Sequence, residues 1–443
     1  MRGLLIIALA AALGGCASTP PSWDNGPPDG QAPSLDNQGA SWRRAEAPKG
    51  ALDLAELFAL AEQLNPTLQA ARERVEAGRG RELQAGLWPN PSLQVSGEFE
   101  TSRPRFATST RRVMIGQPVV LSGRLGLAQA AERAALAADE LDIGAVRHSI
   151  YGAVHQVWVD VVYLGEATQI QFELIDMAEE IAETLEQAAQ DGRATAADAE
   201  RARLAAMRLR GDLLGLITAR TVATEQLMAL LGGIAISPTH VVGSLATGVP
   251  FGEVAVERDS VVAAHPELVA AEARVAAARQ AMGLAKREWL PDVEVLVGAS
   301  YNDNTDETMG EVGLGIGLPI FNRNQGRIRE AEAQVREAEA LRDEVEQRLT
   351  AELATLFQLL SELDTLAEDY ATAVEPHSLR ALESARAGFA AGKDSPLGLV
   401  DALRSMAETR RQTAEYRYQM NSALAAFRHF NRFGSEEAAG LEN

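Results

Sequence analysis

The residue types that most often carry out chemistry are scattered along this chain of 443 residues. Its six histidines and nine methionines form no group with the spacing of a zinc or copper site. His148 and His155 are seven residues apart and so share one face of a predicted helix, where exposed histidines are commoner than metal ligands. The chain also has no phosphate-binding glycine loop, nucleophile elbow or catalytic carboxylate pair. From the sequence we therefore expect no enzyme activity, no metal site and no cofactor.

Cys16 is the one residue whose position predicts a covalent modification, and it is the only cysteine. It follows a short basic start and an apolar run over residues 4–13, which predicts a signal peptide over residues 1–15. That run is too short to span a membrane as a helix. The four residues that end at Cys16, Leu-Gly-Gly-Cys, resemble a bacterial lipobox, in which the cysteine is acylated and becomes the first residue of the mature chain. An ordinary buried or cleaved cysteine is the alternative.

The composition excludes one class of partner and favours one type of secondary structure. The formal net charge of -21 argues against nucleic acid, because phosphate binding needs basic patches. Residues 16–50, which include the proposed lipid anchor, are rich in Pro, Ser, Gly and Asp and predict an extended tether. Beyond them a large share of the apolar residues is alanine, which favours closely packed helices.

A helix, turn and strand pattern occurs twice, roughly 200 residues apart, which indicates an internal duplication. The matching positions are Asn65-Pro66 with His265-Pro266, Trp88 with Trp289, and Gly192-Arg193 with Gly392-Lys393. We therefore expect a first repeat over residues 51–248, a second over 249–431 and a tail over 432–443.

Two long stretches have apolar or small residues at steps of three and four and no strong turn signal. They run over residues 124–189 and 325–387 and predict coiled-coil helices, each ~95 Å long at ~1.5 Å per residue. Pro376 lies inside the second and should bend it. Shorter helices are expected over residues 66–87, 196–231, 266–288 and 396–431. In each half, two of them would stack end to end and pair side by side with the long helix as an antiparallel rod.

The turn at the far end of each helical pair has clear capping signals. Gly192 and Gly392 are suited to helix C-caps. Thr195 with Asp198 resembles a capping box, and Ser395 before Pro396 resembles an N-cap followed by proline at the first helical position.

Four segments alternate between apolar and polar residues, as strands do. They lie near residues 92–100, 112–119, 292–302 and 311–318. About ten residues with one apolar face fit a transmembrane strand, although a half-buried sheet of a soluble domain fits the strands equally well. Trp88 and Trp289 each lie just before the first strand of a repeat, which is where an aromatic belt at a membrane surface is expected. Two tryptophans of an ordinary protein core are the alternative.

Four strands cannot close a barrel, and open sheet edges are not tolerated in lipid. Several chains must therefore share one barrel, and three chains would supply 12 strands.

These features resemble the outer-membrane efflux protein family, the TolC-like exit ducts of tripartite pumps, over essentially the whole mature chain. The junction after the last strand resembles the heavy-metal, CzcC-like branch, through Leu318, Pro319, Ile320, Phe321, Asn322, Arg323, Asn324, Gln325 and Gly326. The second helical tip resembles the family pattern through Val374, Pro376, Ala385, Gly388, Phe389, Gly392, Lys393, Ser395, Leu397, Val400, Asp401 and Ala402.

The resemblance implies an α+β membrane protein that works as a homotrimer. A 12-stranded barrel in the outer membrane, four strands from each chain, would continue as a long coiled-coil barrel through the periplasm. Its tips would meet a periplasmic adaptor (membrane fusion) protein and an inner-membrane transporter of the RND type.

Family members often carry paired acidic residues after the second tip, which form a ring in the closed tunnel. Asp401 occupies one such position, but Gly398 occupies the other, which puts a double ring in doubt. Asp401 could equally be a solvated helix residue. Asp198 follows the first tip, where helix capping is the favoured role and a gate role the alternative.

The function expected from these features is a passive, lipid-anchored outer-membrane duct for efflux, opened by adaptor contact at the tips, with divalent metal ions as the favoured cargo. The same duct could instead export drugs or proteins. A periplasmic coiled-coil scaffold lipoprotein without transport is the alternative from a different class.

Overall fold

The computed structural model describes residues 50–99, 108–245, 258–303 and 305–431, all within one compact unit, Glu46–Asn443. The expected signal peptide, Cys16, almost all of the tether and the tail over residues 432–443 lie outside the described residues.

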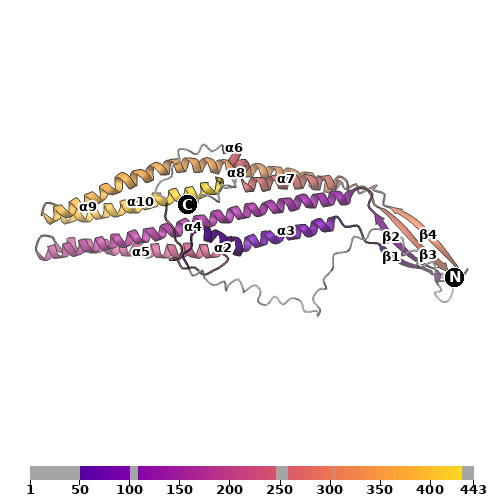
Figure 1. The fold of residues 1–443 in the computed structure, drawn as a ribbon, viewed down its shortest axis with the longest axis horizontal. Helices are drawn as coiled ribbons and strands as arrows, with labels where there is room; N and C mark the ends of the chain where they lie inside the picture. The colour runs from indigo at the N-terminus through magenta and orange to yellow at the C-terminus, as the bar shows by residue number, and fades with distance from the viewer. Residues whose placement is uncertain (1–49, 100–107, 246–257, 304, 432–443) are drawn as a thin grey trace. The chain divides into compact units, whose positions relative to one another are not determined.

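The order of helix, two strands, long helix and returning helix occurs twice along the chain (Figure 1). The first half contains α2 (Leu54–Leu64), α3 (Pro66–Ala85), β1 (Ser92–Phe99), β2 (Thr108–Val119), α4 (Arg124–Gln190) and α5 (Ala196–Leu230). The second contains α6 (Arg258–Ala263), α7 (Pro266–Ala285), β3 (Val293–Asn302), β4 (Glu307–Ile316), α8 (Gln325–Asp369), the π-helix η4 (Tyr370–Val374), α9 (Glu375–Ala390) and α10 (Pro396–Asn431).

The four strands form one antiparallel sheet in the order β1-β2-β3-β4. Strands β2 and β3 come from different halves of the chain, so the sheet joins the two repeats. Within it, β1 pairs only with β2 and β4 only with β3, so both outer edges are open among the described strands.

Helix α4 is the centre of the helical part and packs against α3, α5, α7 and α10. Its buried residues recur at steps of three and four, as a helix with one packed side requires. Near the tips, Leu174, Ile181 and Leu185 of α4 form one apolar cluster with Leu399 and Met406 of α10. The two repeats therefore share a core.

Several boundaries differ from the sequence-based expectation. The long helix expected over residues 325–387 is interrupted by η4, where the Glu375 N–H donates to the Tyr370 carbonyl. Pro376 has no N–H that could donate the next helical hydrogen bond. The wider π-helical turn of η4 ends just before it, at Val374. Strand β4 ends at Ile316 instead of residue 318, β2 begins at Thr108, and the short helices α2 and α6 were not expected.

Candidate functional site

One face of the sheet is apolar and exposed. The strand register places Leu93, Ile115, Val297 and Val312 side by side across all four strands. All four count among the exposed large apolar residues, and Val312 is 80% exposed. A contiguous apolar surface of this kind is unusual on a monomeric soluble domain and is typical of a face that contacts lipid or another protein.

The opposite face of the sheet is polar and lined in part by small residues. Arg112 Nε lies 2.7 Å from a Glu311 carboxylate oxygen, and its guanidinium also faces Glu98 at 3.8 Å. Beside this cluster, Gly298 and Gly313 add no side-chain volume. The face therefore suits a water-filled interior.

Trp88 and Trp289 are exposed at the ends of the helices that lead into the sheet. Their exposed fractions are 59% and 44%, so the alternative of two core tryptophans is wrong. Phe321, in the connection between β4 and α8, is exposed as well.

The junction after β4 is a hydrogen-bonded turn centred on Asn324. This residue is the N-cap of α8 and has a left-handed backbone, with φ 61°. Its Nδ2 donates to the Ala285 carbonyl at 2.7 Å and to Glu288 at 3.0 Å, which ties the end of α7 to the start of α8. Arg323 and Gln325 close the turn, since the Arg323 N–H donates to Gln325 Oε1 at 2.8 Å. Gly123, at φ 68°, occupies the equivalent position before α4.

The Asn324→Ala variant should lower the free energy of unfolding by about 1–3 kcal/mol. It removes both side-chain hydrogen bonds and places a Cβ with no local polar group at a positive φ. Asn324→Gly is the matched control, because it loses the same bonds but relieves the backbone, as Gly123 does in the first repeat. Urea unfolding of both variants separates the two contributions, and equal losses would exclude a backbone contribution.

Both helical tips contain a left-handed glycine followed by a capped helix. Gly192 has φ 74° and Gly392 has φ 70°. At the first tip Thr195 and Asp198 form a reciprocal capping box at the start of α5. At the second tip, the Gly398 N–H donates to Ser395 Oγ at 3.1 Å. Both tips are thus sharply defined turns.

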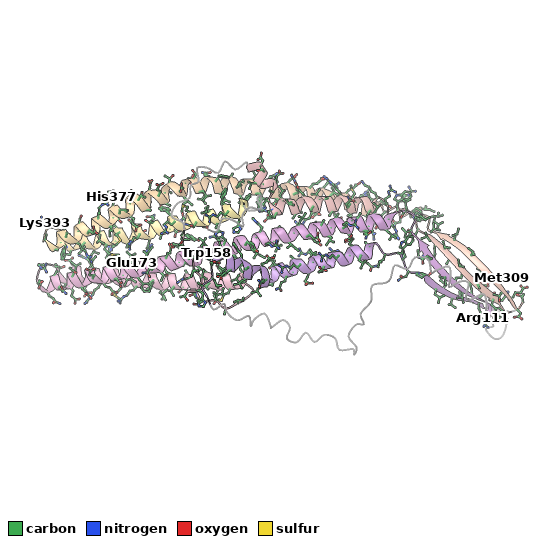
Figure 2. All side chains as sticks on the ribbon, viewed as in Figure 1. Arg111, Trp158, Glu173, Met309, His377 and Lys393 are labelled. Carbon is green, nitrogen blue, oxygen red and sulfur yellow. The ribbon has the colours of Figure 1, made fainter. Side chains whose placement is uncertain are left out.

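The two acidic tip residues have different surroundings. Asp198 accepts hydrogen bonds from the Thr195 hydroxyl and N–H, which lower the pKa of its carboxyl, and it also bonds Arg201. Asp401 is exposed, and its nearest ion-pair partner is Arg404 at 3.9 Å. Asp198 is therefore engaged in capping, whereas Asp401 can face a pore or solvent. Lys393 marks the second tip (Figure 2).

The histidines do not lie where the sequence placed them. His148 and His155 were expected on an exposed helix face, but both are buried, because α7 and α10 pack against that side of α4. Each forms a close pair with a histidine of the second half, His265 and His429 respectively. One signal was available: His265 occupies the same position before a proline as Asn65 does in the first repeat.

Within the described residues, no group of three or more His, Cys, Asp or Glu side chains is arranged to hold a metal ion. The helices of that part also include none with the length and apolar character needed to cross a bilayer.

Comparison with known proteins identifies the fold. The family model "Outer membrane efflux protein" matches residues 57–233 and 258–430. A curated relative, the cobalt-zinc-cadmium resistance protein CzcC of Cupriavidus metallidurans, is 27% identical over 365 residues, which are 82% of this chain and 85% of CzcC. The pyoverdine export outer membrane protein OpmQ of Pseudomonas putida is 26% identical over 96% of both chains.

Solved structures share the same fold at lower identity. A structure of CusC is similar with a TM-score of 0.70 and 20% identity, and the match covers 88% of this chain and 96% of CusC. The outer membrane protein VceC of Vibrio cholerae gives a TM-score of 0.71 at 21% identity over 85% of this chain and 95% of VceC. The expected fold class, with four strands per chain and long helices in a repeated order, is confirmed. The chain belongs to the outer membrane efflux protein family.

Proposed function

We propose that three copies of this chain form one continuous duct across the outer membrane and the periplasm. The observation that supports this proposal is a sheet of four strands with two open edges, one face of which is apolar and exposed. In lipid, the free backbone groups of β1 and β4 need strand partners, and only neighbouring copies of the sheet can supply them. Three such sheets give 12 strands, which is within the range of outer-membrane barrels.

A second exposed apolar surface supports the same assembly. Helix α5 carries five exposed apolar residues that are not among its buried residues: Leu204, Met207, Leu214, Ile217 and Val222. We define these five residues as the α5 stripe. In a helical tunnel made of three copies, this stripe packs against the neighbouring protomer.

Lipid and two further proteins complete the proposed setting. Cys16 would carry the lipid anchor, and Trp88 and Trp289 would lie at the membrane surface. The tips at Gly192 and Gly392 would meet a periplasmic adaptor, which would connect the duct to an inner-membrane transporter of the RND type. No part of this arrangement calls for an enzymatic step.

The proposed cargo is divalent metal ions, because CzcC is a relative that covers most of this chain. OpmQ, a relative over 96% of the chain, favours an organic export substrate as the alternative. A strain that lacks the gene, complemented with the chain, should regain resistance to cobalt, zinc or cadmium. If resistance stays low while export of a chelating organic compound is restored, the cargo is organic.

The channel itself is tested on purified full-length protein in planar bilayers. Discrete conductance steps and a cross-linked trimer are expected. Folded monomer that carbonate releases from membranes after removal of the lipid would instead support a periplasmic scaffold.

The Asp401→Ala variant should raise the leak conductance of the closed duct. The exposed carboxylates of three copies would narrow the tip, and a methyl group in their place would widen it. Asp198→Asn is the control, because Asn retains an N-terminal capping group and the tip turn with it. Single-channel recording provides the measurement. A leak conductance equal to that of the native chain would exclude Asp401 as a gate residue.

A further inference from the structure

Four of the six histidines meet where the two halves of the chain pack together. His148 and His155 lie on α4, His265 is the N-cap of α7, and His429 lies in the last turn of α10. All four are buried, and His265 is only 2% exposed. The Nε2 atoms of His148 and His265 are 3.0 Å apart, and His155 Nδ1 lies 3.0 Å from His429 Nε2. We name these four residues the histidine joint.

The hydrogen bonds assign the protons of the first pair. The Glu267 N–H donates to His265 Nδ1 at 3.3 Å, so this nitrogen is an acceptor and the proton of the neutral ring lies on Nε2. His265 Nε2–H therefore donates to His148 Nε2. A second proton on either ring would turn an acceptor into a donor. A proton on His265 Nδ1 would face the Glu267 N–H, and one on His148 Nε2 would face the N–H of His265.

In the described part of the chain, one acidic side chain acts on both histidines of the first pair, and it is already engaged in an ion pair. This side chain is Glu267 of α7, and its carboxylate is paired with Arg348 of α8 at 2.5 Å. On α2, Phe58 packs against His155 and His429, while Glu62 is bonded to Arg147 of α4.

A positive charge is also unfavourable at this point of the fold. His265 caps the N-terminus of α7, which is the positive end of the helix dipole. Burial, and then the neighbouring His148, lower the pKa of His265 to about 4, against an opposing effect of Glu267. Burial likewise lowers the pKa of His148. Both rings are therefore neutral at pH 7.

We propose that the histidine joint is a proton-sensitive clamp, which holds α4 of the first half against α7 and α10 of the second and loosens when His148 and His265 are protonated. This property goes beyond the efflux function, since it concerns contacts within one chain and depends on no cargo.

The direction of the pH dependence follows from the lowered pKa. When the joint opens, His265 recovers an ordinary pKa near 6.5, so the open form binds more protons than the closed form between pH 6.5 and about 4. The stabilisation is complete above pH 6.5 and is lost as the pH falls towards 4. In this window the ratio of open to closed joint should rise up to tenfold per pH unit.

The first repeat provides the matched variant. Asn65 occupies the position equivalent to His265: its Oδ1 accepts from the Thr67 N–H at 2.8 Å, and its Nδ2 donates to the Leu230 carbonyl at 2.8 Å. His265→Asn therefore retains an N-cap and a donor but cannot titrate. His377→Asn is the control, because His377 (labelled in Figure 2) is exposed on α9, a helix that contributes no residue to the joint.

The experiment is hydrogen–deuterium exchange of the full-length protein in detergent between pH 7.5 and 4.5, with chelator present so that no bound metal contributes. Protection factors, which correct for the intrinsic pH dependence of exchange, are compared for peptides from the first turns of α7 and from α4 around His148.

The native chain and His377→Asn should lose protection in these peptides by at least tenfold on acidification. His265→Asn should lose threefold or less while keeping its protection at pH 7.5. His148→Gln serves as a second variant in case His265→Asn does not fold. Constant protection in the native chain across this pH range would overturn the proposal. So would a loss of protection on acidification in His265→Asn and His148→Gln that equals the loss in the native chain. Conductance is not part of the readout, so a failed efflux assignment leaves the result interpretable.

Discussion

Lysine in place of Val95 is expected to prevent membrane assembly, whereas lysine in place of the neighbouring Gln94 is expected to leave it intact. The two residues are adjacent in β1 but lie on opposite faces of the sheet. Val95 is 73% exposed and pairs with Val113 on the apolar face. Gln94 shares its face with Met114, Gly298 and Glu311.

The size of the effect follows from the position of Val95 halfway along β1. A lysine on the lipid face near the bilayer midplane costs about 2–4 kcal/mol per chain, and a trimer carries three such chains. The amount of trimer that remains in outer-membrane fractions after a urea wash provides the measurement. Equal recovery of Val95→Lys and Gln94→Lys trimers would show that the apolar face does not contact lipid.

Glutamate in place of Leu214 should reduce trimer formation in detergent at least tenfold. Leu214 lies in the α5 stripe and is 67% exposed in the single chain. If the stripe packs against the next protomer, the variant loses about 1.5–3 kcal/mol of apolar burial in each of three interfaces and also places a carboxylate there.

The matched control for Leu214 is Ala219→Glu on the same helix. Ala219 is exposed and lies ~140° around the helix axis from Leu214, at the edge of the α5 stripe beside Val222, so the variant adds the same charge without removing a stripe side chain. Analytical ultracentrifugation of the purified variants gives the trimer fraction. If Leu214→Glu and Ala219→Glu form trimers equally well, the α5 stripe is not an interface.

The sequence predicted the helices and strands because their signals are local. The steps of three and four along α4 predicted a helix over residues 124–189, and the structure has Arg124–Gln190. Alternation in β3 placed Val293, Val295 and Val297 on one face, as observed. Turn residues were equally informative, since the positive φ at Gly192 and Gly392 is a conformation that glycine adopts without steric cost.

Some predictions were incomplete where neighbouring elements decide the outcome. Pro376 predicted a disturbance of the second long helix, but not the π-helix over Tyr370–Val374 that absorbs it. The short helix α2 was missed because it covers only 11 residues, although its Leu57 is fully buried against the helical core.

By itself, the sequence determined the repeated order of helices and strands, the apolar face of the sheet and the two capped tips, because each follows from residues within a few positions of one another. Only the tertiary structure decided that His148 meets His265, 117 residues further along the chain, and that His155 meets His429. Contacts over such separations depend on how α4, α7 and α10 pack, and no local period of apolar residues specifies which polar groups that packing brings together. The same limit applies to Asn324. Its hydrogen bonds to Ala285 and Glu288 form because the C-terminal end of α7 lies beside the N-terminus of α8 in space.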